Sequence, residues 1–365
     1  MILNVDTVRA TLQELKDPWT GRDYVSGREA RNIRVEGSDV SVEIVLGYPS
    51  RSIHEQIRAQ VAAALGALEG AGRVSVEVSM KIAAHQALRG AQRVEGVRNI
   101  IAVASGKGGV GKSTVAANLA LALAAEGARV GVLDADIYGP SQPTMLGMAG
   151  KPRVAEEGNR KLFLPMENHG VQGISIGMLI DPDQAVAWRG PMATGALEQL
   201  LRDTKWDDLD YLVVDMPPGT GDIQLTLAQK VPVTGAVIVT TPQNIALLDA
   251  RKGLKMFEKV NVPILGIVEN MSFHACSNCG HEEHIFGSGG GESMAQDYGV
   301  PLLGALPLDI RIREQADSGA PTVVADPDSR VAGLYREIAR RVGVRVSELS
   351  RDSSTVFPKI VIQNT

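Results

Sequence analysis

The sequence predicts an α/β fold in which a doubly wound, mostly parallel sheet is preceded by a small α+β domain. Two observations support this prediction. From residue 99 onward, short runs that are apolar on both faces alternate with segments of helical periodicity, as in a parallel sheet covered by helices on both sides. Within the first ninety residues, apolar and polar residues instead alternate along short segments, which is typical of half-buried strands.

The first domain begins with a helix. Apolar residues recur at helical spacing over residues 5–16, and Asp17 and Pro18 then end the helix. Gly37 and Ser38 form a plausible turn between two alternating segments. The remaining elements expected in this domain are strands at 33–35, 40–46 and 74–80 and a helix at 52–68.

The second domain is expected to alternate strands and helices. The predicted strands are 100–104, 130–133, 211–214, 236–240, 264–268 and 302–305. The predicted helices are 114–126, 192–202, 246–260, 292–298 and 329–342. The chain therefore divides into a small domain (1–90), a linker (91–98), a large domain (99–343) and a polar, loosely held tail (344–365).

Composition and charge exclude several classes of protein. The 365 residues carry a net charge of −5, whereas dedicated duplex-DNA binders usually present a basic face. Two cysteines are too few for a disulfide-stapled secreted fold. No apolar run is long enough to cross a membrane, and the N-terminus does not resemble a signal peptide. We therefore expect a cytoplasmic protein that binds neither nucleic acid nor membrane.

A phosphate-binding loop follows the first strand of the large domain. The sequence G-K-G-G-V-G-K-S matches G-x-x-x-x-G-K-[ST] between a predicted strand and a predicted helix. Its glycines let backbone N–H groups turn toward a phosphate, and the helix N-terminus adds partial positive charge. Lys112 can reach the terminal phosphates of ATP, and the Ser113 hydroxyl can ligate Mg²⁺. The predicted nucleotide contacts are Gly106, Lys107, Gly108, Gly109, Val110, Gly111, Lys112, Ser113 and Thr114.

Aspartates end two neighbouring strands of the large domain. Ligands of doubly wound sheets bind beyond the carboxyl ends of the strands, where Asp134, Asp136 and Asp215 are expected. Asp215 follows four apolar residues and is predicted to hold Mg²⁺, directly or through water. The alternative is that these aspartates only cap helices. The proline- and glycine-containing segment 217–221 is predicted to be a loop that a γ-phosphate orders.

The phosphate loop resembles that of the deviant Walker A family of P-loop ATPases, whose fingerprint is K-G-G-x-G-K-[ST]. The resemblance implies a homodimer in which Lys107 contacts the phosphates bound by the partner subunit, as an arginine finger does. It also implies that Asp136 orients or deprotonates the attacking water, with Asp134 as a supporting acid. Lys107, Lys112, Asp136 and Asp215 are thus the candidate catalytic residues.

Cys276 and Cys279 form a C-x-x-C pair after the strand at 264–268. A redox dithiol is one interpretation, although such motifs usually accompany a thioredoxin-like unit. A zinc site completed by His281 or His284 within one chain is a second. In the third, two chains supply the four thiolates that a [4Fe–4S] cluster needs. A purely structural pair is the fourth.

The motifs together resemble the Mrp/Nbp35 (ApbC) family of iron–sulfur cluster carrier ATPases over about residues 97–345. They are the phosphate loop, D-A-D-I-Y-G-P-S (134–141), D-M-P-P-G-T-G-D (215–222) and N-M-S-x-x-x-C-x-x-C (270–279). The resemblance implies slow ATP hydrolysis, transfer of a [4Fe–4S] cluster from donors to apoproteins, and adenine contact by Asn270, which is otherwise a turn residue.

The first ninety residues resemble the MIP18-like domain through L-K-D-P-x-T-G, residues 15–21. Some members of that domain family carry a cysteine near the end of the strand region, and the comparable stretch 46–51 here has none. Partner docking is therefore the expected role of this domain.

Three further functions stay open at this stage. A MinD- or ParA-type positioning ATPase would need a basic amphipathic C-terminal helix or a basic surface, and residues 344–365 show no such stripe and contain Pro358. A nitrogenase-reductase-like electron donor would need two widely separated cysteines per chain. A dimeric ATPase with structural, zinc-bound cysteines is the remaining alternative.

Overall fold

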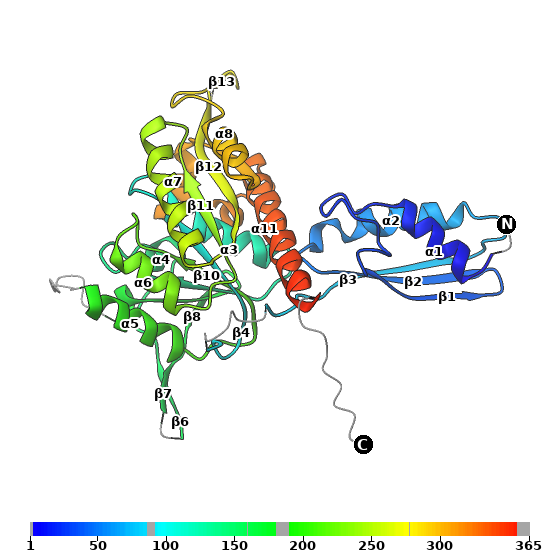
Figure 1. Ribbon diagram of the computed structural model, residues 1–365, viewed down its shortest axis with the longest axis horizontal. Helices are drawn as coiled ribbons and strands as arrows, with labels where there is room; N and C mark the ends of the chain where they lie inside the picture. The colour runs from blue at the N-terminus through cyan, green and yellow to red at the C-terminus, as the bar shows by residue number, and fades with distance from the viewer. Residues whose placement is uncertain (1–2, 86–91, 159, 180–189, 277, 356–365) are drawn as a thin grey trace.

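The computed structural model describes residues 3–85, 92–158, 160–179, 190–276 and 278–355, with side chains described to residue 350. The chain forms a small N-terminal unit and a larger unit built on one central sheet, and helix α11 (Arg330–Thr355) stands between them (Figure 1). In the part of the chain that the structure describes, no helix is long and apolar enough to cross a bilayer.

The N-terminal unit has a three-stranded sheet in the order β1-β2-β3. β1 and β2 are antiparallel, whereas β2 and β3 are parallel. Two helices cover the sheet and share its apolar core, to which Val8, Leu12, Ile57, Val61 and Leu65 contribute. The elements are α1 (Val5–Glu14), β1 (Ala30–Glu36), β2 (Asp39–Leu46), the short 3₁₀ helix η1 (Arg51–Ile53), α2 (His54–Gly66) and β3 (Val74–Met80).

The larger unit has a central sheet in the order β13-β12-β11-β4-β10-β5-β9-β8, and β14 pairs with β12. All pairings are parallel except those of the edge strands β8 and β13, which confirms the predicted fold class. Its strands are β4 (Val97–Ala104), β5 (Val130–Asp134), β8 (Met166–Asn168), β9 (Val171–Ser175), β10 (Leu209–Asp215), β11 (Gly235–Thr240), β12 (Ile264–Ala275), β13 (Glu282–Glu283) and β14 (Leu302–Pro307).

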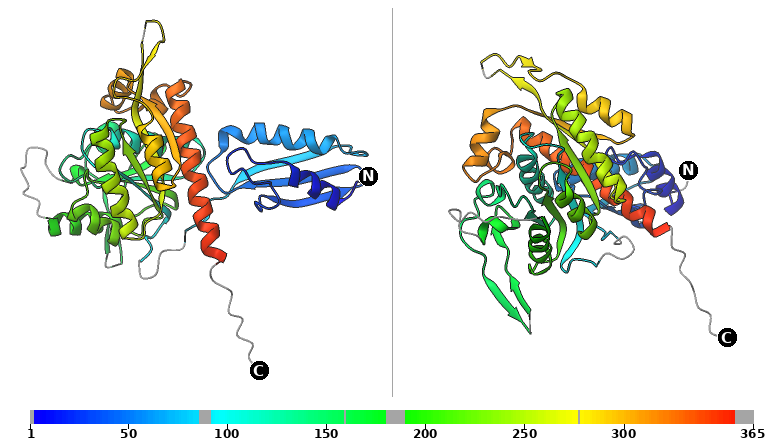
Figure 2. Two further views of the ribbon diagram at one scale, coloured as in Figure 1. Left: turned by 45° about the horizontal axis from the view of Figure 1, so that its top comes forward. Right: turned by 60° about the vertical axis from the view of Figure 1, so that its left-hand side comes forward.

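The five helices predicted for the larger unit are present, and the unit has further short helices that were not predicted. The helices are η2 (Ile176–Met178), α3 (Lys112–Ala125), α4 (Gln142–Met145), α5 (Gly190–Arg202), α6 (Asp222–Lys230), α7 (Asn244–Lys259), α8 (Gly290–Tyr298), α9 (Ile310–Asp317), α10 (Thr322–Ala325) and α11. The antiparallel hairpin β6 (Val154–Glu157) and β7 (Arg160–Phe163), which projects from the body (Figure 2), was also not predicted.

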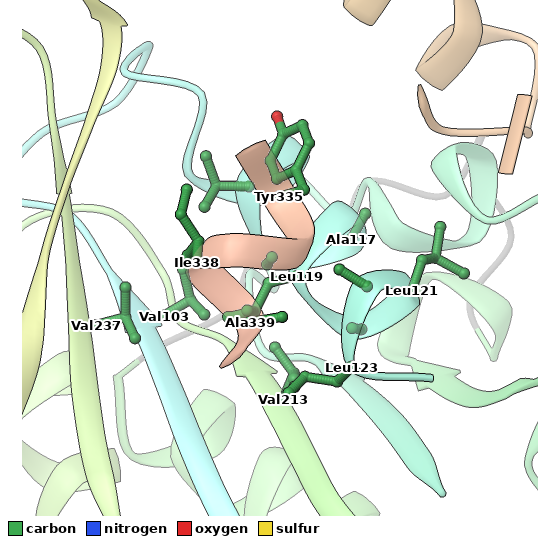
Figure 3. Close-up of a cluster of buried hydrophobic side chains, with 14 of the residues drawn as sticks. Val103, Ala117, Leu119, Leu121, Leu123, Val213, Val237, Tyr335, Ile338 and Ala339 are labelled. Carbon is green, nitrogen blue, oxygen red and sulfur yellow. The ribbon is translucent and has the colours of Figure 1, made fainter. Parts of the chain in front are cut away.

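Helix α3 is buried along almost its whole length, between the sheet and α11 (Figure 3). Its alanines and leucines from Ala116 to Leu123 have essentially no exposed surface. Small side chains such as Ala117 and Ala339 let the helices approach closely, and Leu119 and Ile338 fill the space toward Val103 of β4. The helix that begins at the phosphate loop is therefore held by close packing along its central turns.

The prediction of a loosely held tail from residue 344 is wrong as far as Thr355, because α11 continues through Gly343. Gly343 is not a helix terminator here: a Cβ at this position would lie 2.5 Å from Pro49 Cδ, so glycine permits close packing on the N-terminal unit. Val344 joins the core of that unit. The predicted linker also ends early, since β4 begins at Val97; residues 86–91 lie outside the described part.

The two units meet at the C-terminal end of α3, around the fully buried side chain of Glu126. Its carboxylate accepts hydrogen bonds from Ser52 Oγ (2.7 Å) and Ser52 N (3.1 Å) of the N-terminal unit. Arg340 of α11 pairs with the same carboxylate at 2.6 Å. The guanidinium of Arg340 also lies 4.4 Å from the ring centroid of Trp19. This cluster fastens the N-terminal unit to both α3 and α11.

Candidate functional site

The phosphate loop lies between β4 and α3, and its glycines are needed for two different reasons. Gly109 and Gly111 both have φ of 81°, in the left-handed region that favours glycine. A Cβ on Gly106 would lie 2.1 Å from the backbone of Asp249 in α7, and one on Gly111 would lie 2.2 Å from Asn270 Nδ2. The sequence pattern predicted the turn; the close approach of α7 and β12 became visible only in the fold.

Lys112 is the positive centre of the site. Its side chain is only 6% exposed, and its Nζ forms a close ion pair with Asp215. The same nitrogen lies 3.1 Å from Ser113 Oγ and 3.9 Å from Asp136 Oδ2. The structure thus brings together four residues that the sequence singled out. Lys107 is half-buried on the loop, where its carbonyl accepts a hydrogen bond from Ser105 Oγ at 2.9 Å.

The two acid-bearing strands are neighbours, because β5 and β10 pair in parallel with Asp134 opposite Asp215. Asp134 is fully buried and accepts hydrogen bonds from Asp136 N, Ser141 N, Gln142 N and Ser175 Oγ, at 3.0–3.1 Å. Burial and the charge of Asp215 raise the pKa of Asp134 to about 7, although the hydrogen bonds from Gln142, Asp136 and Ser175 oppose the shift. Asp134 therefore organises the segment that carries Asp136.

Asp136 and Asp215 face Lys112 rather than a helix start. Residue 141 is the N-cap of α4 and residue 221 that of α6, so neither aspartate caps those helices. Burial raises the pKa of Asp136, Lys112 opposes that shift, and Asp215 adds to it. Asp215 is fully buried at the end of β10. The geometry suits these carboxylates to hold a cation or to exchange a proton.

Gln142 is a site residue that the sequence analysis missed. Its side chain is almost fully buried, and Nε2 donates to Ser113 O at 2.9 Å and to Asp215 Oδ2 at 2.8 Å. Glutamine has no distinctive spacing in a phosphate-loop motif, so no sequence signal pointed to it. The contact exists only because the loop after β5 folds over the end of β10.

Asn270 lies in β12, beside the phosphate loop. Its Nδ2 donates to Val110 O at 2.8 Å, and the residue is 7% exposed. In this arrangement the amide supports the loop backbone. Contact between Asn270 and an adenine base stays a prediction. The carbonyl of Thr114, another predicted contact, accepts a hydrogen bond from Asn118 Nδ2 at 3.0 Å within α3.

The cysteine pair lies where β12 turns toward β13, on a hairpin that projects from the body (Figures 1 and 2). Cys276 is half-buried and Cys279 is exposed. Backbone N–H groups of Cys279 and Asn278 lower the pKa of the Cys276 thiol, and the Cys279 side chain and His274 add to the shift. A lowered thiol pKa favours the thiolate, which is the form that binds metals.

Two histidines near the thiols each place one ring nitrogen against a backbone carbonyl, and His281 is exposed. His284 Nδ1 lies 2.8 Å from Ser272 O, and His274 Nδ1 lies 3.0 Å from Leu308 O. Among the residues described, three or more histidine, cysteine, aspartate or glutamate side chains nowhere gather in an arrangement that could hold a metal ion. The described part of one chain therefore offers two thiols without a third metal ligand beside them.

Comparisons with known proteins agree with this arrangement of motifs. The family described as NUBPL iron-transfer P-loop NTPase matches residues 96–343, and that described as iron–sulfur cluster assembly protein matches residues 5–78. An Escherichia coli K12 protein named iron–sulfur cluster carrier protein is 51% identical over 339 residues, covering 93% of this chain and 91% of its own. The mouse iron–sulfur cluster transfer protein NUBPL is 52% identical over 251 residues, which cover 68% of this chain and 78% of the mouse protein.

Solved structures give the same fold. A nucleotide-binding protein from Archaeoglobus fulgidus, in complex with ADP, is 37% identical with a TM-score of 0.56 and covers 65% of this chain and 91% of its own. The Pyrococcus furiosus cell-division ATPase MinD, at 24% identity and a TM-score of 0.51, covers 67% and 98% and shows the fold alone. The chain therefore belongs to the family of NUBPL-type iron-transfer P-loop NTPases, with curated relatives named iron–sulfur cluster carrier proteins, as its motifs predicted.

Proposed function

We propose that this protein is an ATP-dependent carrier that holds a [4Fe–4S] cluster between two copies of the chain and transfers it from cluster donors to apoproteins. The observation that carries the proposal is the exposed hairpin with two thiols, of which Cys276 has a lowered pKa. Such a cluster takes four thiolates, and the described part of one chain offers two. Two hairpins brought together in a homodimer would complete the ligand set.

The nucleotide site fits Mg²⁺ and ATP. The oxygen of Ser113 and the carboxylate of Asp215 both contact the ammonium of Lys112, so they already converge on one cation. Hydroxyl and carboxylate oxygens are ligands that Mg²⁺ prefers. When bound, Mg²⁺ would neutralise charge that develops on the phosphates. Lys112 would hold the terminal phosphates, and Lys107 of each chain would reach the phosphates of the other.

Hydrolysis in this proposal is slow and depends on Asp136. Its carboxylate lies 3.9 Å from Lys112 Nζ, at the edge of the site where a terminal phosphate would be held. A carboxylate with a raised pKa can orient a water molecule and accept its proton. Nucleotide can favour cluster release only if it binds two dimer geometries with different affinities. Equal ATP affinities of the apo and cluster-loaded dimers would contradict this coupling.

The alternative of a membrane-positioning ATPase is less well supported. The C-terminal helix α11, which the sequence analysis did not expect beyond residue 342, buries Ala339, Val342 and Val346 in the protein core. Two of its arginines bond inside the molecule, Arg340 to Glu126 and Arg341 to Leu303 O. This apolar face is therefore already covered by protein. The cytoplasmic location and partner docking by the N-terminal unit stay predictions.

Anaerobic reconstitution with iron and sulfide tests the proposal, using the wild type, Cys276→Ser, Cys279→Ser and Lys112→Ala. We expect the wild type to bind four irons per two chains and to absorb near about 400 nm. The serine variants should lose the iron and retain ATP binding, whereas Lys112→Ala should retain the iron and lose ATP binding. Lys230→Ala, which removes an exposed partner of Glu198, is the matched lysine control.

Three outcomes would contradict the proposal. An unchanged iron content in both serine variants would show that the two thiols are not ligands of the cluster. If the cluster-loaded protein sediments as a monomer, the cluster is not shared between two chains. A colourless protein that retains one zinc per chain would favour the structural zinc alternative instead.

A further inference from the structure

We propose that Gln142 is a positioning residue for Mg²⁺: its side chain holds Asp215 and Ser113 in the arrangement that receives the metal ion together with ATP. The inference rests on the proposed ATPase function and adds a residue to that site. Gln142 is the first residue of α4, in the segment that follows Asp136, and is separated by 29 residues from Ser113 and by 73 from Asp215.

The hydrogen bonds of Gln142 reach the carboxylate of one predicted metal ligand and the backbone of the other. One nitrogen, Nε2, donates to the carbonyl of Ser113 (2.9 Å) and to Oδ2 of Asp215 (2.8 Å). The other oxygen of that carboxylate, Oδ1, pairs with Lys112. Asp215 is therefore held from both sides, which sets the plane of its carboxylate. The backbone N–H of Gln142 donates to Asp134 Oδ2 at 3.1 Å, which fixes the start of the side chain as well.

The charge balance explains why a neutral donor suits this place. Asp134, Asp136 and Asp215 are all buried or nearly so; the ammonium of Lys112 faces Asp136 and Asp215, and Asp134 lies beside Asp215. A hydrogen bond to a carboxylate favours its charged form. A second cation here would do the same but would repel Mg²⁺. The Gln142 amide donates to one oxygen of Asp215 without adding positive charge, so it orients that carboxylate and does not repel the metal ion.

An unused acceptor is the second observation. Oε1 of Gln142 is buried and has no hydrogen-bond partner in the structure, as is also true of the neighbouring Ser141 Oγ. A buried amide oxygen without a donor is costly, and such groups in native proteins call for an explanation. Mg²⁺ usually keeps several water ligands when it binds protein carboxylates and phosphates. A water ligand of the metal is the donor that Oε1 would accept from.

The test is an Mg²⁺ titration of the binding of a fluorescent ATP analogue to the full-length protein, with a parallel measurement in EDTA. Gln142→Met keeps the length of the side chain and removes its hydrogen bonds. Because a hydrogen bond to a charged group is lost, we expect the Mg²⁺ midpoint to rise roughly 10- to 100-fold. Nucleotide affinity in EDTA should change by less than about threefold, since no metal ligand is then in use.

Two further variants make the result interpretable. Gln142→Asn keeps an amide but is one methylene shorter, so it covers the case in which the methionine variant does not fold, and we expect it to raise the midpoint in the same direction. Gln172→Met in β9 is the matched control: that side chain accepts a hydrogen bond from Asp207 N at 3.2 Å, outside the site. It should leave both the midpoint and the affinity in EDTA unchanged.

The outcomes separate this inference from the proposed function. If the wild type shows no Mg²⁺-dependent ATP binding, both the proposed function and the role of Gln142 are wrong. A normal wild type with unchanged midpoints in the folded Gln142 variants would overturn the role of Gln142 alone. An equal loss of affinity with and without Mg²⁺ would also overturn it, because that result indicates a general collapse of the phosphate loop.

Discussion

The two ends of α3 each meet a buried cluster of charged side chains, and the clusters differ in their balance of charge. At the N-terminal end, the carboxylates of Asp136 and Asp215 face the ammonium of Lys112, and the buried carboxylate of Asp134 lies beside Asp215 on the next strand. At the C-terminal end, one carboxylate, that of Glu126, faces one guanidinium, that of Arg340. The same helix therefore joins an unbalanced cluster to a balanced one.

The different charge balance indicates that the Glu126 cluster is structural and that the Lys112 cluster can take part in chemistry. Glu126 uses both oxygens on donors from the protein, so its charge is fully compensated without any ligand. Such a pair fastens one part of a protein to another, and removal of one partner leaves an uncompensated buried charge. The excess of carboxylates at the other end favours an added cation or proton, which is the property that a catalytic site needs.

The substitution expected to lower the free energy of unfolding most lies in the balanced cluster. Glu126→Ala should lower the free energy of unfolding by about 3–5 kcal/mol, because the buried guanidinium of Arg340 loses its partner. Denaturant unfolding measures this loss. The control is Glu258→Ala, which breaks an exposed pair with Lys255 and should cost less than about 1 kcal/mol. Equal costs for the two variants would contradict the structural role of the Glu126 cluster.

A second prediction concerns the unbalanced cluster and pH. Because the pKa of Asp134 is raised to about 7 in the folded protein, the folded form holds a proton between about pH 4 and 7 that the unfolded chain has released. The free energy of unfolding should therefore fall as pH rises through this window, by at most about 4 kcal/mol from this group. Urea unfolding without Mg²⁺ at several pH values measures the slope.

Asp134→Asn is the control for that slope, since an amide has a similar shape and does not ionise in this range. We expect the fall in stability between about pH 4 and 7 to be shallower in this variant than in the wild type. Identical slopes would show that Asp134 does not carry the extra proton.

A substitution at the edge of the balanced cluster should lower the free energy of unfolding least. Trp19→Leu keeps an apolar side chain and removes the ring that lies 4.4 Å from the Arg340 guanidinium. We expect a loss of about 1 kcal/mol, the usual size of a cation–π contact. Trp19→Phe retains a ring and should lose less. If leucine and phenylalanine have the same effect, packing rather than the cation–π contact holds Arg340 against the N-terminal unit.

Local patterns in the sequence predicted a large part of the fold and of the site. The strands of the large domain were recognisable because parallel strands buried on both faces are continuous apolar runs. β9 was not predicted because Gln172 and Gly173 interrupt its apolar run. Short helices such as α4 and α10 are too brief to show a period. The predicted form of α11 ended too early because a glycine such as Gly343 commonly terminates helices. In the structure, Gly343 instead allows close contact with Pro49.

Local motifs were enough to identify the phosphate loop and the pair of thiols, because each motif is contiguous and needs particular residue types in a fixed order. The packing of distant segments determines that Asp134 organises a loop while Asp136 and Asp215 face Lys112. It also decided that Gln142 reaches Ser113, and that Ser52 meets Arg340 across 288 residues. Contacts between segments so far apart depend on how the chain packs, and no local pattern encodes them.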